Sequence, residues 1–149
     1  MNLKHSLSLA ALLLGLAATG SASAVEYNTG YFGRVAIEGF DPVAYFTEGK
    51  AHKGSDNITT EWEGVIWHFA SAENRDLFVK DPAAYAPQFG GLCTEGVAFG
   101  EITVNLVPEN FAIVDGKLYL AAGTYFADLP TNLPVAMGKW ATVHDLLAE

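Results

Sequence analysis

Cys93 is the residue of this sequence that offers the widest choice of chemistry. It is the only cysteine in 149 residues and lies in the glycine-rich stretch QFGGLCTEGVAFG, residues 88–100. A free cysteine can pack as a small hydrophobic residue, its thiolate can bind a soft ion such as Cu(I) or zinc, or it can serve in redox chemistry. The redox role needs a stabilised thiolate. No C-x-x-C partner and no neighbouring Lys or Arg supplies one, and Glu95 disfavours the anion.

His68 is the natural second ligand if Cys93 binds a metal. We expect it near the end of a strand, on the face opposite the apolar residues and just before a helix that starts at Ser71. The alternative is a hydrogen-bonded structural histidine. A closed zinc site takes four ligands, and the sequence contains no evident four-ligand cluster. Any metal site is therefore low-coordinate, shared between chains, or absent. His144 and Met137 become outer ligands only if the last helix folds back over the Cys93 loop.

Other polar residues receive structural interpretations. Ser71 is interpreted as a helix cap and not as a nucleophile, because no G-x-S-x-G turn or Asp-His-Ser arrangement accompanies it. Asp41 and Tyr45 are explained by turn capping and core packing, and His52 is expected to be solvated in a polar loop. The sequence also lacks a phosphate-binding glycine loop and the H-E-x-x-H motif. No catalytic residues are therefore predicted.

The segment ITTEWEGVIWHFA, residues 58–70, predicts a β-hairpin with its turn at Glu63-Gly64. A two-residue turn pairs Trp62 with Val65, Thr60 with Trp67 and Ile58 with Phe69. This register collects apolar side chains on one face, namely Ile58, Trp62, Val65, Trp67 and Phe69. His68 then lies on the opposite face.

A helix is predicted directly after this hairpin, over AENRDLFVK, residues 72–80. Ser71 is its expected N-cap, and Glu73 is favourably placed in the first turn. We expect Leu77 and Phe78 to face the core.

Two Asp-Pro pairs predict further turns or helix starts. In each pair the aspartate is the expected cap and the proline occupies the first helical position. Asp41-Pro42 is the first, and Asp81-Pro82 opens a short second helix that runs to Tyr85.

The last third of the chain predicts a second hairpin and a closing helix. FAIVDGKLYL, residues 111–120, has an Asp-Gly turn at its centre, which is a strong hairpin signal. Its expected buried face contains Phe111, Ile113, Leu118 and Leu120. Residues 137–149 show helical spacing of apolar side chains. Short hairpins and short helices without β-α-β units indicate a small α+β domain.

The N-terminus predicts an exported protein. Residues 1–24 combine a short basic start, an apolar stretch and small residues at the end, as a signal peptide does; an uncleaved anchor is the alternative. Residues 25–149 are then one domain, periplasmic or secreted. The net charge of −9 disfavours binding to nucleic acid or to anionic lipid. We therefore expect no nucleic-acid partner and, after signal cleavage, no membrane association.

Five motifs in order resemble the YHS domain, and in particular its exported bacterial single-domain members. They are GFDPVAYF (39–46), WHFASAENRDLF (67–78), DPAAYAPQFGGLC (81–93), EGVAFG (95–100) and VDGKLYL (114–120). His68 and Ser71 stand at the family's signature positions. Trp67 replaces the usual tyrosine, so any role of that hydroxyl is lost, and Leu92 stands where an aromatic residue is expected.

The resemblance implies a link to heavy-metal transport, because YHS domains occur in or beside copper-pumping ATPases. It brings the Cys93 loop and His68 together as the expected ligands of a copper or zinc ion, with a metal-transport partner. Two alternatives stay open. One is a non-catalytic structural, interaction or small-ligand-binding module in which Cys93 is packed; the other is a thiol redox protein.

Overall fold

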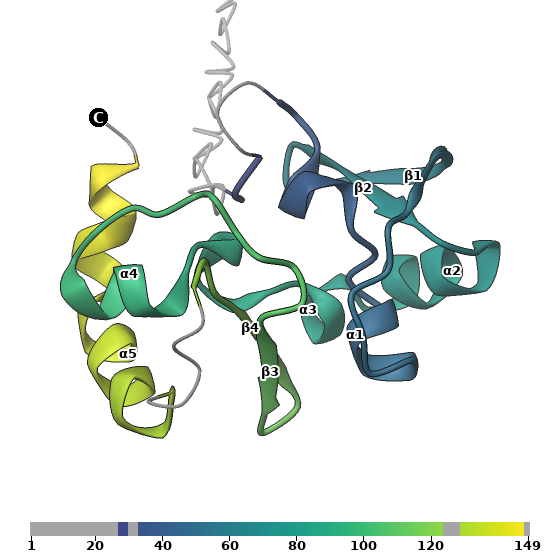
Figure 1. Cartoon of the computed structure of the whole chain (residues 1–149). Coiled ribbons are helices and arrows are strands. Elements are labelled where there is room, and N and C mark those ends of the chain that lie inside the picture. Colours follow the sequence, from purple (N-terminus) through teal and green to yellow (C-terminus); the bar gives the residue numbers. More distant parts are fainter. Residues whose placement is uncertain (1–26, 30–32, 124–128, 148–149) are drawn as a thin grey trace, which may run out of the picture.

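The computed structural model describes residues 27–29, 33–123 and 129–147, and these form a small α+β domain (Figure 1). The predicted signal peptide, residues 1–24, lies outside the described residues. The helices are α1 (Ala44–Thr47), α2 (Ala72–Lys80), α3 (Pro82–Tyr85), α4 (Thr94–Phe99) and α5 (Leu129–Leu146), with 3-10 turns η1 (Ala36–Gly39) and η2 (Gln88–Gly91). The strands are β1 (Ser55–Trp62), β2 (Val65–Phe69), β3 (Phe111–Val114) and β4 (Lys117–Leu120).

Two antiparallel hairpins organise the domain, β1–β2 and β3–β4. Figure 1 shows β1, β2 and α2 at one end of the molecule, the β3–β4 hairpin in the middle, and α4 beside α5 at the other end. The first core cluster lies under β1–β2 and contains Trp67, Phe69 and Phe78. The second contains Val97 of α4 and Val143 of α5.

The register of the first hairpin is confirmed near its turn and shifted at its far end. Trp62 pairs with Val65 and Thr60 with Trp67, as the two-residue turn requires. The predicted pairing of Ile58 with Phe69 is wrong: Phe69 pairs with Ser55, across an irregularity in β1. Val65, Trp67 and Phe69 are buried, as their alternation predicts.

Helix α2 begins and ends where the sequence predicts. The Ser71 hydroxyl accepts a hydrogen bond from the Asn74 backbone N–H at 3.1 Å, so the N-cap is confirmed. Phe78 is fully buried, but Leu77 is 39% exposed, which contradicts its predicted place in the core. A helix of nine residues covers the β-hairpin with one narrow stripe, and Phe78 occupies that stripe.

The second hairpin is confirmed with its turn at Asp115-Gly116, but its burial differs from the prediction. Leu118 and Leu120 enter the first core cluster, whereas Tyr119, on the opposite face of β4, enters the second. Both faces of β4 are thus buried. Ile113 of β3 is 39% exposed, whereas its partner on β4, Leu118, is fully buried.

The C-terminal helix is confirmed but starts earlier than the expected residue 137. Helix α5 runs from Leu129 to Leu146 and packs on α4. Val143 is buried, and the Trp140 ring lies 5.4 Å from the Phe89 ring. Helix α4 forms where the four glycines of residues 88–100 suggest a loop, so the loop prediction is wrong for Thr94–Phe99.

Candidate functional site

Cys93 lies at the start of α4, directly after the η2 turn. Its backbone N–H donates to the Thr103 carbonyl at 3.1 Å, and the residue forms a parallel bridge with Leu120 at the end of β4. The η2 turn has positive φ angles at Phe89, Gly90 and Gly91, a backbone conformation that glycine adopts more readily than other residues. Cys93 therefore sits where the glycine-rich stretch meets the second hairpin.

The Cys93 thiol is buried, with 4% of the residue exposed, and both its hydrogen-bonding functions are used. Sγ accepts a hydrogen bond from the Ala122 N–H at 3.3 Å. It also donates toward the Glu95 carboxylate, with an Sγ to Oε2 distance of 3.8 Å. Glu95 is buried as well, at 9% exposure. The thiol thus connects the first turn of α4 to the segment that follows β4.

His68 lies on β2, paired with Thr59 and half-buried on the face opposite Trp67 and Phe69, as predicted. Its ring packs against Gly39: a Cβ on this glycine would come within 3.1 Å of His68 Nδ1. The missing side chain of Gly39 therefore provides the space for the imidazole.

The contacts described for His68 and Cys93 involve different segments of the chain. His68 pairs with β1 and packs against Gly39 of η1, whereas Cys93 contacts Glu95, Leu120 and Ala122. Within the described residues, no group of three or more His, Cys, Asp or Glu side chains is placed to hold a metal ion.

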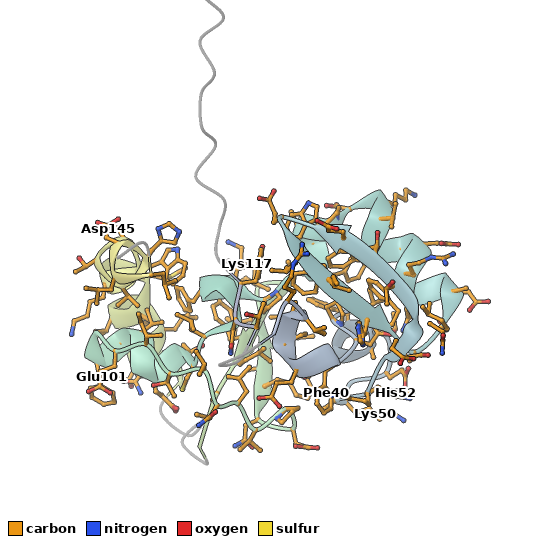
Figure 2. The ribbon with its side chains drawn as sticks, turned by 90° about the horizontal axis from the view of Figure 1, so that it is seen from above. Phe40, Lys50, His52, Glu101, Lys117 and Asp145 are labelled. Carbon is orange, nitrogen blue, oxygen red and sulfur yellow. The ribbon has the colours of Figure 1, made fainter. Side chains whose placement is uncertain are left out.

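The remaining candidate ligands have other surroundings. Met137 is 55% exposed on α5, and the His144 ring lies edge-on to the Trp140 ring, with the centroids 5.3 Å apart. His52 is exposed beside Lys50, as expected (Figure 2), and its Nδ1 lies 3.0 Å from a carboxylate oxygen of Glu48. The hydrogen bond from His52 holds the pKa of Glu48 below its usual value, with Lys50 acting in the same direction.

Asp41 and Tyr45 have the structural roles that the sequence predicts. One carboxylate oxygen of Asp41 accepts from the backbone N–H groups of Val43 and Ala44, at 2.8 and 3.2 Å, which caps the turn into α1. Tyr45 is buried and its hydroxyl donates to the Pro108 carbonyl at 3.2 Å. Burial, followed by the carboxylate of Glu109 and others nearby, raises the pKa of Tyr45 well above its usual value.

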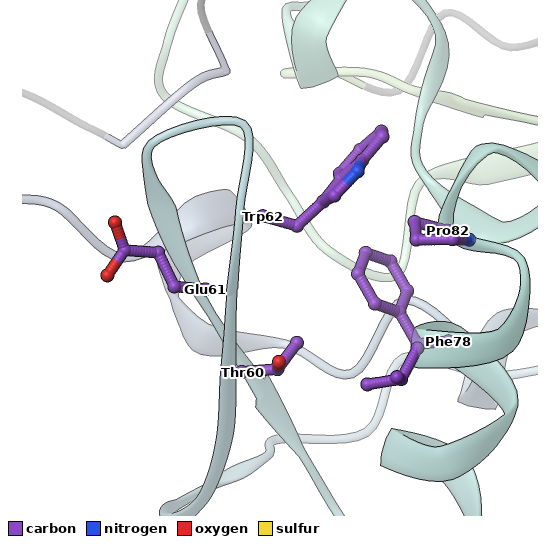
Figure 3. Close-up of a pocket in the computed structure, with 6 residues that line it drawn as sticks. Thr60, Glu61, Trp62, Phe78 and Pro82 are labelled. Carbon is purple, nitrogen blue, oxygen red and sulfur yellow. The ribbon is translucent and has the colours of Figure 1, made fainter.

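A pocket between β1 and the α2–α3 segment was not predicted from the sequence. It is partly open to solvent, has a volume of about 160 Å³ and is lined by Thr60, Glu61, Trp62, Phe78, Val79 and Pro82. Figure 3 shows Trp62, Phe78 and Pro82 around the space, while the Glu61 carboxylate projects from the other side of the strand. The sequence carried one signal for it: Thr60 and Trp62 share a face of β1, beyond the part of that face that the core fills.

Comparisons with protein-family models, with curated proteins and with solved structures found no match for this chain. The relationship to the YHS family remains a prediction from the five sequence motifs. Among the described residues, none of the helices combines the length and the apolar character needed to span a bilayer.

Proposed function

We propose that this chain is an exported, non-catalytic binding or interaction module of the YHS type, in which Cys93 is a packed structural residue. The environment of Sγ carries the proposal. The sulfur is buried, accepts the Ala122 N–H and donates to Glu95. A cysteine in such a position behaves as a small core residue that also satisfies a backbone donor.

The same contacts favour a structural role of Cys93 over metal binding. A cysteine binds a metal as the thiolate, so Cys93 would have to lose its proton and its hydrogen bond to Glu95. His68 would have to form its bond to the metal from the space beside Gly39. Binding of copper or zinc by Cys93 and His68, supplied by a metal-transport partner, is the alternative that the following experiment tests.

The test is a competition titration of the reduced mature protein with Cu(I) against a chelator. We expect the wild type, Cys93→Ala and His68→Ala to bind equally, and His52→Ala serves as a control for an exposed histidine. Cys93→Ala should lower the free energy of unfolding by about 1–2 kcal/mol. One equivalent of Cu(I) held by the wild type and lost in both variants would show the metal site instead.

Alkylation separates the structural cysteine from a redox thiol. Because Sγ is buried, iodoacetamide should label the native protein much more slowly than the urea-unfolded protein across the pH range. A native rate equal to or above the unfolded rate would favour the redox interpretation and overturn the proposal.

A further inference from the structure

We propose that the pocket between β1 and the α2–α3 segment binds a small organic cation with an apolar body, such as an arylalkylammonium ion. The proposed function above names no ligand and no binding surface, so this inference goes beyond it. It rests on the rigidity of the pocket wall, on its size and on the charges around it.

The wall of the pocket is an indole that neighbouring rings hold in place. The Trp62 ring lies 5.5 Å from the Tyr27 ring, 6.0 Å from the Trp67 ring and 5.7 Å from the Phe78 ring. Trp62 is nevertheless only half-buried. A ring that is fixed on one side and open on the other offers a preorganised surface, so a ligand orders few side chains on binding.

The other walls are mostly apolar and supply one hydroxyl. Phe78 is the fully buried lining residue, and Pro82 faces Trp62 (Figure 3). Val79 also lines the pocket and is 56% exposed, which places it at the rim. Thr60 contributes the side-chain oxygen. The pocket volume of about 160 Å³ is close to that of an engineered cavity of about 150 Å³ that takes up benzene. One ring, or an alkyl group of the same size, fills it.

The surrounding charge selects the sign of the ligand. Residues 60–63 and 76–82 carry four acidic side chains and one basic one: Glu61, Glu63, Asp76, Asp81 and Lys80. Arg34 and Arg75 offset two of these acidic groups, because they lie 3.7 Å from Glu61 and 2.8 Å from Asp76. The groups around the pocket then sum to −1, so the negative field comes mainly from the net charge of −9 of the whole chain. Because the Glu61 carboxylate projects away from the pocket, the acidic groups act through their field and not through a direct ion pair.

A cation is therefore favoured twice, by the face of the Trp62 ring and by the negative field. A cation over an exposed aromatic face gains a factor on the order of fivefold in affinity. The contribution of the field falls with ionic strength, because the Debye length is about 8 Å at physiological salt. Both effects require the ammonium group to lie at the mouth of the pocket and the apolar body inside it.

The experiment titrates the mature protein with three ligands of the same ring and length: phenethylamine, 2-phenylethanol and phenylacetate. Indole N–H resonances report on each tryptophan separately, and Trp140, which packs on Phe89 in the second core cluster, is the internal control. We expect shifts at Trp62 with affinity falling from the amine to the alcohol to the acid, and a smaller difference at high salt. Equal affinities, stronger binding of phenylacetate, or no movement of Trp62 at millimolar ligand would overturn the proposal. Equal shifts at Trp140 would also overturn it.

Matched variants at the rim test the site itself. Val79→Lys and Val79→Glu place opposite charges on similar stems at an exposed helix position, so both are expected to fold. Phenethylamine should bind Val79→Glu on the order of tenfold more tightly than Val79→Lys. Val135→Lys, at a residue 46% exposed on α5, should behave as the wild type. Equal binding by the two Val79 variants would place the ligand elsewhere, whereas the Cu(I) titration of Cys93→Ala would be unaffected by that result.

Discussion

Replacement of Asp41 by alanine should be one of the most destabilising single changes in the domain. The side chain is fully buried, and its carboxylate accepts four hydrogen bonds. Two come from the backbone of Val43 and Ala44. The other two come from the Ala70 N–H at 2.8 Å and the Asn74 side-chain amide at 2.7 Å. One carboxylate thus joins the start of α1, the end of β2 and the first turn of α2.

The expected loss follows from the donors that Asp41→Ala would leave without an acceptor. A buried donor that loses its partner costs about 1–3 kcal/mol. The donors share oxygens in pairs and the Asn74 amide can turn toward water, so the costs do not simply add. We expect a loss of about 3–5 kcal/mol, a large part of the roughly 5–15 kcal/mol that stabilises a typical domain. Asp41→Asn keeps one acceptor oxygen and should lose less, which provides a second variant if the alanine protein does not fold.

Asp81 provides a matched control, because it also precedes a proline at the start of a short helix. The prediction that Asp81 caps α3 is wrong, because its side chain makes no capping hydrogen bond. Asp81→Ala should therefore change stability by about 0.5 kcal/mol or less. Urea denaturation followed by far-UV circular dichroism measures both variants, with an unchanged m-value expected. A loss below about 1 kcal/mol for Asp41→Ala, or equal losses at the two positions, would refute the reasoning.

Three further perturbations test other parts of the structure. Gly54→Ala should destabilise by about 1–3 kcal/mol in a urea titration, because a Cβ there would lie 2.5 Å from the His68 carbonyl carbon; an unchanged midpoint would contradict this packing. Gly138→Ala should stabilise by about 0.5–1 kcal/mol, since it lies inside α5 with no atom within 4 Å of an added Cβ; a loss of stability would contradict it. Burial, and then the charge of Glu63, raises the pKa of Tyr27 to about 12 from 10.0. The phenol of Tyr27 therefore stays protonated to a higher pH in the folded state than in the unfolded state. This difference stabilises the fold below pH 10, and the stabilisation is lost as the pH rises from 10 to about 12. Absorbance titration of Tyr27 against a Tyr27→Phe control measures this, and ionisation near pH 10 would contradict it.

Local patterns were sufficient to predict most elements near their turns and caps. The Glu63-Gly64 turn determines the pairing of Trp62 with Val65. Ser71 caps α2 through a hydrogen bond from Asn74, which is only three residues away in the sequence. These interactions join neighbours in the sequence, so the residues alone predict them. The predictions failed where distant segments decide the outcome, as for the exposed side chains of Leu77 and Ile113.

The candidate sites divide in the same way. The sequence identifies Cys93 as a candidate functional residue and predicts the face of β2 on which His68 lies. It does not predict their neighbours, which are Glu95 and the Ala122 backbone for Sγ and Gly39 for the imidazole. Such neighbours come from separate elements, and no spacing rule in the chain reports them. The Trp62 pocket likewise exists only because α2 and α3 pack beside β1.

By itself, the sequence determined the α+β class, the positions of both hairpin turns, the cap of α2 and the burial of alternate residues in β2. Only the tertiary structure decided between the two Asp-Pro pairs, which are the same dipeptide with the same local signal. Asp41 is buried because the end of β2 and the first turn of α2 bring Ala70 and Asn74 to its second oxygen. Asp81 remains exposed at the surface. The two aspartates contribute unequally to stability because losing a hydrogen bond costs most where its donors are buried, and burial depends on the whole fold.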